Sequence, residues 1–198
     1  MRPKAKLSFR QSTLPTLLLT LTLFSCATPT ATKEDSFSPT GDSFTQASES
    51  SQILEGKVVS ILDGDTIIVL DTNNETFKVR LASIDAPENS QPFGQQAKQK
   101  LSSLIFDRNV SVKWKVRDRY ERILGKVENN GQDICLKMIE TGYAWHYKRF
   151  QQSQQPSDRN SYTEAENRSR QQQIGLWKDP NPIPPWDYRS QPKTNRSY

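Results

Sequence analysis

The sequence predicts an α+β domain built around a small barrel of five strands. Short runs with alternating apolar residues come first, and turn residues such as Asn, Asp and Gly separate them. One helical segment follows three strands, then two more strands and two helices complete the pattern. Strands followed by helices are typical of α+β folds, and short strands separated by turns are typical of small barrels.

The first three predicted strands lie at 53–62, 66–70 and 76–81. An Asp-Gly-Asp sequence at 63–65 separates the first two, because these residues favour tight turns. A loop of Asp, Thr and Asn at 71–74 leads into the third strand. That strand alternates apolar and polar residues, which indicates one buried and one exposed face.

A helix is predicted at 93–105, because its apolar residues recur at helical spacing and so share one face. The fourth strand, at 110–116, again alternates apolar and polar residues. The fifth, at 123–128, ends in an Asn-Asn-Gly sequence that is typical of a hairpin turn.

Two further helices complete the predicted domain. The first covers 134–141, and Gly142 stands in the position of a C-terminal stop. The second is expected to start at Ser157 or Asp158 as its cap and to end at Gly175. The proline-rich residues after it predict an extended tail that lies along the surface or is free.

The first 25 residues are interpreted as a signal peptide and not as part of the fold. Four basic residues precede an apolar run at 14–24, which is too short to span a bilayer. The residues up to Cys26 resemble a bacterial lipoprotein box, so we expect lipidation of Cys26, with cleavage after Ala27 as the alternative. The protein is therefore predicted to be exported and lipid-anchored in the cell envelope, or else fully secreted.

Composition divides the rest of the chain. The segment after the leader is rich in Ser, Thr and acidic residues, so it is expected to be a flexible spacer and not a folded unit. The predicted order is a signal peptide at 1–25, a spacer at 26–52, a folded domain at 53–178 and a proline-rich tail at 179–198.

Net charge and cysteine content are weak guides to function. The formal charge of +5 falls to +1 without the leader, because 23 basic and 22 acidic residues remain. A mildly basic domain is compatible with a polyanionic ligand but does not identify one. If Cys26 carries lipid, Cys135 has no partner, so we expect no internal disulfide and a buried Cys135.

Acidic residues and arginines gather at the ends of the predicted strands. Asp65 follows the first turn, Arg80 lies near the end of the third strand, and Asp85 and Glu88 come shortly after it. A second charged cluster, at 118–122, joins the last two strands. Converging oxygen ligands suit a hard cation, and guanidinium groups suit phosphate. The two clusters therefore predict a metal-dependent phosphodiesterase site.

Taken in order, these motifs resemble the staphylococcal nuclease family. The resemblance covers roughly residues 53–178, at spacing close to that of the family. Each motif is weak alone, whereas the ordered set is specific. The motifs are Asp63-Gly64-Asp65-Thr66, Arg80-Leu81, Asp85-Ala86-Pro87-Glu88, Phe93-Gly94, Asp118-Arg119-Tyr120-Glu121-Arg122 and Gly175-Leu176-Trp177.

The resemblance implies a five-stranded OB-fold barrel with three helices, one calcium ion, and hydrolysis of phosphodiester bonds in DNA and RNA with low sequence specificity. It implies that Asp65 and Asp85 bind Ca²⁺ through their carboxylates and Ala86 through its backbone carbonyl. The best-known member has threonine at the position of Ala86, and a main-chain ligand tolerates this change. Arg80 and Arg122 are implied to grip the scissile phosphate.

The remaining site residues are also assigned by the resemblance. Glu88 would position or deprotonate the attacking water, and Tyr120 and Arg119 would contact the substrate. Asp63 is given a role in the turn or behind the metal ligands. His146, the only histidine, is interpreted as structural, which argues against a histidine-based nuclease or a zinc site.

Two questions stay open at this level. Tyr143, Tyr147 and Phe150 are all candidates for contact with a nucleotide, and the sequence does not choose between them. The predicted function is a monomeric, calcium-dependent endonuclease. The alternative is a non-catalytic OB-fold module that binds nucleic acid or protein. Such modules typically lose one of the acids or arginines, and here none is missing.

Overall fold

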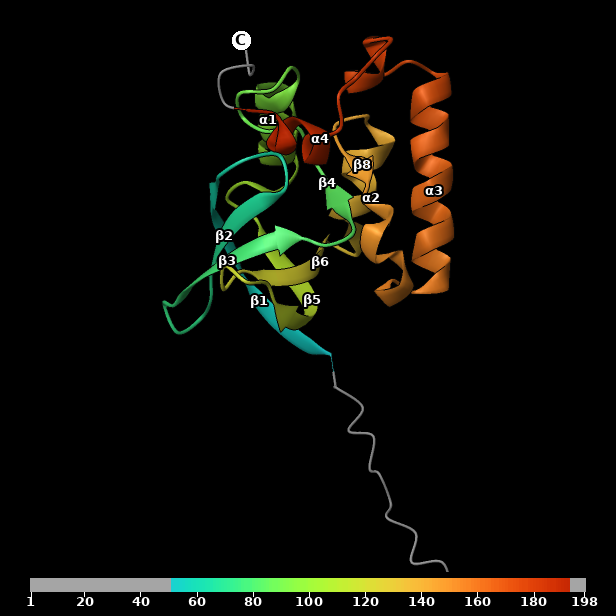
Figure 1. Cartoon of the computed structure of the whole chain (residues 1–198). Coiled ribbons are helices and arrows are strands. Elements are labelled where there is room, and N and C mark those ends of the chain that lie inside the picture. Colours follow the sequence, from blue (N-terminus) through green and yellow to red (C-terminus); the bar gives the residue numbers. More distant parts are fainter. Residues whose placement is uncertain (1–50, 193–198) are drawn as a thin grey trace, which may run out of the picture. The chain divides into compact units, whose positions relative to one another are not determined.

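The computed structural model describes residues 51–192, and they form a closed β-barrel with helices packed around it (Figure 1). The strand order is β3-β2-β1-β5-β6, and a parallel pairing between β3 and β6 closes the barrel. The α+β prediction with a five-stranded OB-fold barrel is confirmed. The barrel strands are β1 (Gln52–Ile61), β2 (Thr66–Leu70), β3 (Thr76–Leu81), β5 (Asn109–Arg117) and β6 (Ile123–Asn129).

Strand β1 is long because it serves both sides of the barrel. Its first half pairs with β5 and its second half with β2, and the register shifts between Val58 and Ser60. Gly56 lies near this crossing, where an added Cβ would stand 2.3 Å from the backbone oxygen of Leu70. Only glycine lets the two strands approach so closely.

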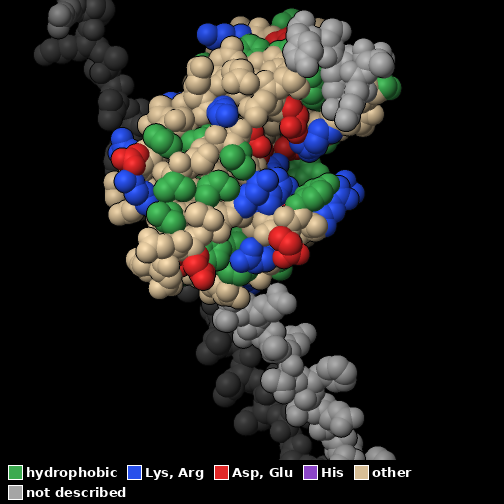
Figure 2. All heavy atoms as spheres, turned by 90° about the vertical axis from the view of Figure 1, so that its left-hand side faces the viewer, with side chains coloured by type: hydrophobic (Ala, Val, Ile, Leu, Met, Phe, Trp, Pro, Cys, Tyr) green, Lys and Arg blue, Asp and Glu red, His purple; other side chains and the backbone are tan. Residues whose placement is uncertain are grey.

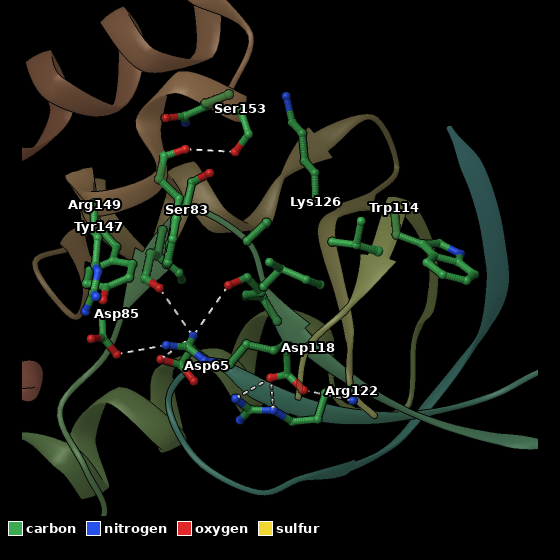
Figure 3. Close-up of a pocket in the computed structure, with 18 of the residues that line it drawn as sticks. Asp65, Ser83, Asp85, Trp114, Asp118, Arg122, Lys126, Tyr147, Arg149 and Ser153 are labelled. Carbon is green, nitrogen blue, oxygen red and sulfur yellow. Dashed lines mark hydrogen bonds and ion pairs between the residues drawn. The ribbon is translucent and has the colours of Figure 1, made fainter. Parts of the chain in front are cut away.

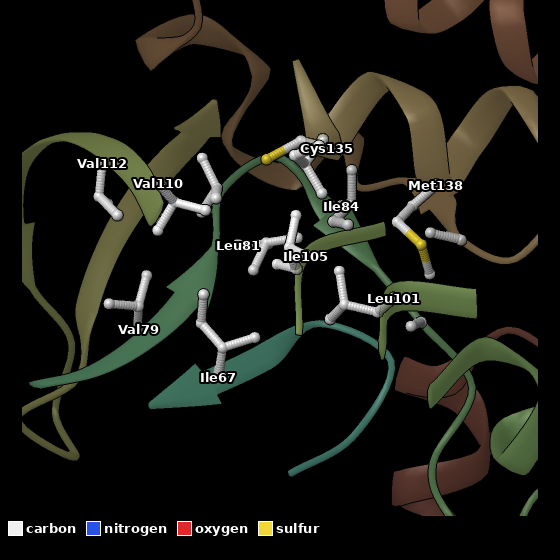
Figure 4. Close-up of a cluster of buried hydrophobic side chains, with 14 of the residues drawn as sticks. Ile67, Val79, Leu81, Ile84, Leu101, Ile105, Val110, Val112, Cys135 and Met138 are labelled. Carbon is white, nitrogen blue, oxygen red and sulfur yellow. The ribbon is translucent and has the colours of Figure 1, made fainter. Parts of the chain in front are cut away.

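The barrel interior is filled by aliphatic side chains from every strand and from helix α1 (Gly94–Ile105), as Figure 4 shows. Ala97, Leu101 and Ile105 of α1 are fully buried, which confirms the predicted apolar face. Cys135 is a free, buried thiol in the same core. Burial, followed by the charge of Asp133, raises its pKa to about 12, so it acts as a small hydrophobic residue.

Helices α2 (Ile134–Glu140) and α3 (Pro156–Gln171) pack against each other beside the barrel (Figure 1). Asp133 caps α2 by accepting a hydrogen bond from the Leu136 amide at 2.9 Å. The predicted start and end of α3 are wrong: Pro156 occupies its first turn, where a missing N–H costs nothing. The helix ends at Gln171, and Gly175 instead begins a short 3-10 helix, Gly175–Lys178.

Three small elements join the helices to the barrel. Strands β4 (Ile84–Asp85) and β8 (Trp145–His146) pair with each other, and β7 (Gln132–Asp133) pairs with β6. A 3-10 helix, Lys148–Ser153, follows β8. His146 is buried, and its ring nitrogens contact Gln154 and Thr163 at 2.9 and 3.3 Å, in agreement with a structural role.

The C-terminal segment departs from the prediction of an extended tail. Residues Pro185–Ser190 form helix α4, which lies beside the end of β4 and α1 in Figure 1. Trp186 of α4 packs edge-on against Trp145, at 6.3 Å between ring centroids, and Trp145 also contacts Trp177. The sequence missed α4 because its stability comes from this packing and not from intrinsic propensity.

Other sequence predictions concern residues outside the described range. These predictions are the signal peptide at 1–25, the lipidation of Cys26, and the spacer at 26–52 except for its last two residues. Between residues 51 and 192, no helix is both long and apolar enough to cross a bilayer.

Candidate active site

The turn between β1 and β2 places Asp65 in the interior. The Asp63 carboxylate accepts a hydrogen bond from the Asp65 amide at 2.9 Å, so Asp63 supports the turn, in agreement with its predicted role. The Asp65 carboxylate accepts the Ala86 amide at 2.8 Å and the Thr66 hydroxyl at 3.1 Å. These bonds join the start of β2 to the segment after β4.

Arg80 joins the two predicted metal ligands. The β2–β3 register places Arg80 opposite Thr66, next to Asp65 in the chain. Its guanidinium lies 2.6 Å from Asp65 and 2.8 Å from Asp85, and it also donates to the Ile84 carbonyl at 3.2 Å. Both acids are almost fully buried and cannot be solvated by water, so the positive charge of Arg80 compensates their negative charge.

This side of the site carries an excess of buried negative charge. Burial raises the pKa of Asp65 well above its ordinary value, Arg80 opposes the rise, and the nearby charges of Asp63 and Asp85 add to it. Arg80 therefore offsets only part of the effect of burial on the Asp65 carboxyl.

The β5–β6 hairpin forms the opposite side and presents Arg122. Asp118 organises the turn by accepting the backbone amides of Tyr120 and Arg122 at 2.9 and 3.1 Å. It also holds the Arg122 side chain, with 2.8 Å to Nε and 2.7 Å to Nη2. Partial burial acts to raise the pKa of Asp118, but the hydrogen bonds from Arg122 and Tyr120 outweigh it and lower that pKa.

The two sides meet in one open cleft of about 1270 Å³. Its lining includes Asp65, Asp85 and Glu88 together with Asp118 and Arg122, and Figure 3 shows the labelled acids and Arg122 around it. The parallel β3–β6 pairing sets Arg80 opposite Leu124, two residues beyond Arg122. Every residue assigned to catalysis or metal binding from the sequence lines this cleft.

Exposed aromatic rings lie at the rim of the cleft. Tyr120 is 63% exposed, and the guanidinium groups of Arg119 and Arg122 lie 4.8 and 5.5 Å from its ring centroid. Phe150 and Tyr147 also line the cleft. Tyr143 instead packs partly buried against the hydrophobic core, so the choice left open by the sequence narrows to the other two. Stacking on such rings suits a planar ligand.

On the face of the molecule in Figure 2, basic side chains lie among acidic and hydrophobic ones, and no single sign covers it.

One residue that binds the acids of this cleft was not predicted. Arg189, on α4, donates to both oxygens of Asp85, at 3.1 and 2.7 Å, and to Glu88 at 2.7 Å. It lies 104 residues after Asp85 in the chain, within a segment whose prolines suggested an extended tail, either along the surface or free. No local pattern could have linked it to the acids.

The donors present here fit a hard divalent cation. Asp65 and Asp85 lie close enough to share one guanidinium, and hard cations prefer carboxylate and carbonyl oxygens. Among residues 51–192, no group of three or more His, Cys, Asp or Glu side chains is gathered as a metal site. The expected set has only two carboxylates beside the Ala86 carbonyl, so it would be completed by water and substrate oxygens.

The barrel topology and this acid- and arginine-lined cleft define an OB-fold protein with a site for an anionic ligand. A family model described as staphylococcal nuclease homologue matches residues 78–179. The chain belongs to the staphylococcal nuclease family, as its motifs suggested.

Curated relatives agree with this membership. The chain is 44% identical over 142 residues to an uncharacterized endonuclease of Haemophilus influenzae, covering 72% of this chain and 76% of that protein. It is 44% identical over 143 residues to the micrococcal nuclease of Shigella flexneri, covering 68% and 79%. It is 37% identical over 152 residues to the protein ParB of Escherichia coli, covering 72% and 83%.

Proposed function

We propose that this protein is a calcium-dependent endonuclease that hydrolyses phosphodiester bonds of DNA and RNA with little sequence specificity. The observation that carries the proposal is the convergence of Asp65, Asp85, Arg80, Arg122 and Glu88 in one cleft. The nuclease names of the relatives support the same class of activity.

Asp65, Asp85 and the Ala86 carbonyl would hold the calcium ion. When bound there, the ion would polarise a phosphoryl oxygen and reduce the negative charge on the phosphate. The raised pKa of Asp65 supports this assignment, because a bound cation offsets the buried negative charge that burial disfavours.

The two arginines hold the phosphate from different elements. Arg80 reaches the cleft from the end of β3 and Arg122 from the β5–β6 turn, so their guanidinium groups approach a phosphate from two directions. Arginine stays charged at any working pH and pairs with phosphate oxygens through two parallel hydrogen bonds. Both groups therefore stabilise the extra negative charge that develops as water attacks phosphorus.

Glu88 would act on the attacking water. Its carboxylate faces the cleft next to Asp85, where it positions the attacking water or accepts its proton. The new P–O bond forms as the ester P–O bond breaks, and the leaving oxygen takes a proton from solvent. Tyr120 and Arg119, at the rim, would contact the neighbouring nucleotide by stacking and charge.

The activity is tested by incubating the purified protein with closed-circular DNA and with RNA, in millimolar calcium or in chelator. We expect calcium-dependent cleavage of both, and Arg122→Ala should lower turnover by about a thousandfold or more. Arg168→Ala is the matched control, because the Arg168 side chain is 57% exposed on α3 and its ion pair is with Glu164, at 3.7 Å.

Intact DNA in calcium would overturn the proposal, and so would equal cleavage by the wild-type and Arg122→Ala proteins. Salt-sensitive binding to nucleic acid without cleavage would instead favour a non-catalytic binding module.

We also propose that the protein is exported and held as a monomer in the cell envelope by a lipid on Cys26. The support is the basic and apolar leader that precedes Cys26. Intact-mass analysis of protein purified from its host should show a lipidated N-terminus, and Cys26→Ser should move the protein from the detergent phase to the aqueous phase. An aqueous, unlipidated wild-type protein would contradict the anchor and leave secretion as the alternative.

A further inference from the structure

Arg189 hydrogen-bonds to both oxygens of Asp85, a predicted ligand of the cation. Asp85 Oδ1 accepts hydrogen bonds from Arg80 at 2.8 Å and from Arg189 at 3.1 Å, while its Oδ2 accepts Arg189 at 2.7 Å. Both oxygens of this carboxylate are therefore engaged by guanidinium groups. A divalent cation and the Arg189 guanidinium repel each other at such distances, so they cannot share Asp85 without cost.

The backbone that carries Arg189 is held firmly in place. The Tyr188 hydroxyl donates to the Ser90 carbonyl at 3.1 Å and lies 3.2 Å from the Ser90 hydroxyl. The Gln91 amide donates to the Ile183 carbonyl, and the Trp186 ring packs at 5.4 Å from the ring of Tyr147. Tyr188 is only 4% exposed. Helix α4 is thus built into the wall of the cleft.

The Arg189 side chain itself is 43% exposed, unlike the 13% exposed Arg80. A long side chain on a fixed base can leave one partner and keep another by rotating its terminal bonds. Arg189 contacts two partners of different predicted roles, the metal ligand Asp85 and the water-activating Glu88. Nη2 donates to Asp85, whereas Nη1 donates to both Asp85 and Glu88, so Arg189 can leave Asp85 and keep Glu88 through Nη1.

We propose that Arg189 is a positioning residue of this active site, a tethered counter-ion that competes with the divalent cation for Asp85 and holds Glu88 in its working orientation. The inference rests on the proposed calcium-dependent hydrolysis. Without a bound metal, Arg189 neutralises Asp85 and keeps the carboxylates in place. With a divalent cation on Asp85, Arg189 would keep its contact with Glu88 and restrain that carboxylate beside the attacking water.

This role predicts two effects of opposite sign. Removing the Arg189 charge should tighten calcium binding, because the internal competitor is gone. The same change should slow turnover at saturating calcium, because Glu88 loses its restraint. A merely structural Arg189 would weaken both properties when it is removed, and a simple plug of the cleft would strengthen both.

The first measurement is calorimetric titration of calcium into the purified, metal-free protein without substrate. We expect Arg189→Gln to bind calcium about tenfold more tightly, and Arg189→Lys to lie between Arg189→Gln and wild type because it keeps the charge but not the fork. Arg168→Gln is the matched control and should bind as wild type does. Unchanged or weaker binding by Arg189→Gln overturns the inference, as does the absence of binding by every variant.

The second measurement is the kinetics of a short oligonucleotide at saturating calcium. Arg189→Gln should lower kcat by about ten- to a hundredfold with little change in KM, since an unrestrained Glu88 leaves substrate binding intact. In a Glu88→Gln background the same change should cause no further loss, because the two residues act together. A raised kcat, or a full further loss in that background, overturns the positioning role.

The two proposals fail separately. If wild-type protein cleaves DNA but Arg189→Gln leaves the calcium affinity unchanged, the inference fails and the proposed function stands. If wild-type protein does not cleave DNA while Arg189→Gln gains calcium affinity, the competition at Asp85 stands and the proposed reaction fails.

Discussion

The two sides of the cleft use the same residue types in different environments. On the barrel side, Arg80 is 13% exposed and lies between two acids that are 7% and 1% exposed. On the hairpin side, Arg122 and Asp118 are 22% and 20% exposed and form one ion pair with each other. A guanidinium on the barrel side is therefore expected to support the fold as well as the proposed reaction, whereas one on the hairpin side is expected to contribute mainly to the reaction.

The largest expected effect comes from removing Arg80 on the barrel side. Arg80→Ala removes the ion-pair partner of the buried Asp65 and leaves Asp85 paired with Arg189, which costs about 3 kcal/mol of unfolding free energy, and turnover falls with it. Arg122→Ala should lower turnover by a similar factor but cost no more than about 1 kcal/mol, as is usual for accessible ion pairs. Denaturant unfolding and cleavage rates of both variants check this. Equal losses of stability would show that the two sides do not differ.

Asp65→Asn tests whether Asp65, on the barrel side, is a calcium ligand. Burial raises the pKa of Asp65, so the charged form is disfavoured in the metal-free fold, and the amide should not lower the melting temperature without calcium. Calcium at a hundred times its Kd should stabilise the wild type by about 2.7 kcal/mol and the variant by almost nothing. Thermal melts with calcium and with chelator make the measurement. If Asp65→Asn retained the calcium-induced rise in melting temperature, Asp65 would not be a calcium ligand.

Tyr120→Ala tests the rim on the hairpin side. Because Tyr120 is exposed and stacked with arginines, its loss should leave stability unchanged and weaken nucleic-acid binding by about 1–3 kcal/mol. Oligonucleotide titrations in calcium with an inactive Arg122→Ala background check this. Tyr120→Phe is the control and should retain most of the affinity, since the ring is kept. Equal affinity for the alanine and phenylalanine variants would exclude stacking at this position.

The smallest expected effect concerns the hairpin turn itself. Asp118→Asn should cost about 1 kcal/mol near neutral pH, through the lost ion pair and weaker turn hydrogen bonds. The pKa of Asp118 is lowered from 3.8 by its hydrogen bonds, against the effect of burial. Its contribution is therefore complete above pH 3.8 and disappears as the pH falls through the lowered pKa. Urea unfolding of both proteins between neutral and acidic pH tests this. A difference that persists in strong acid would point to another cause.

Much of the barrel followed from local pattern. The alternation at 76–81 and the turn at 63–65 depend on neighbouring residues alone, so they predicted β3 and the β1–β2 turn correctly. The predicted ends of α3 were wrong, because the prediction relied on cap residues. Proline at the first turn and packing against α2 instead determine where the helix begins and ends. The short helix α4 was missed for the same reason, since its tryptophan and tyrosine contacts come from distant segments.

The sequence by itself determined the chemistry available to this protein: three carboxylates and two arginines in ordered motifs, with an alternating pattern that builds a small barrel. Only the tertiary structure decided how these groups meet. The parallel β3–β6 pairing brings Arg80 beside the Arg122 hairpin, and the docking of α4 brings Arg189 onto Asp85 and Glu88. Local patterns report which face of a strand or helix is buried, but contacts across a hundred residues depend on packing free energies that no short segment encodes.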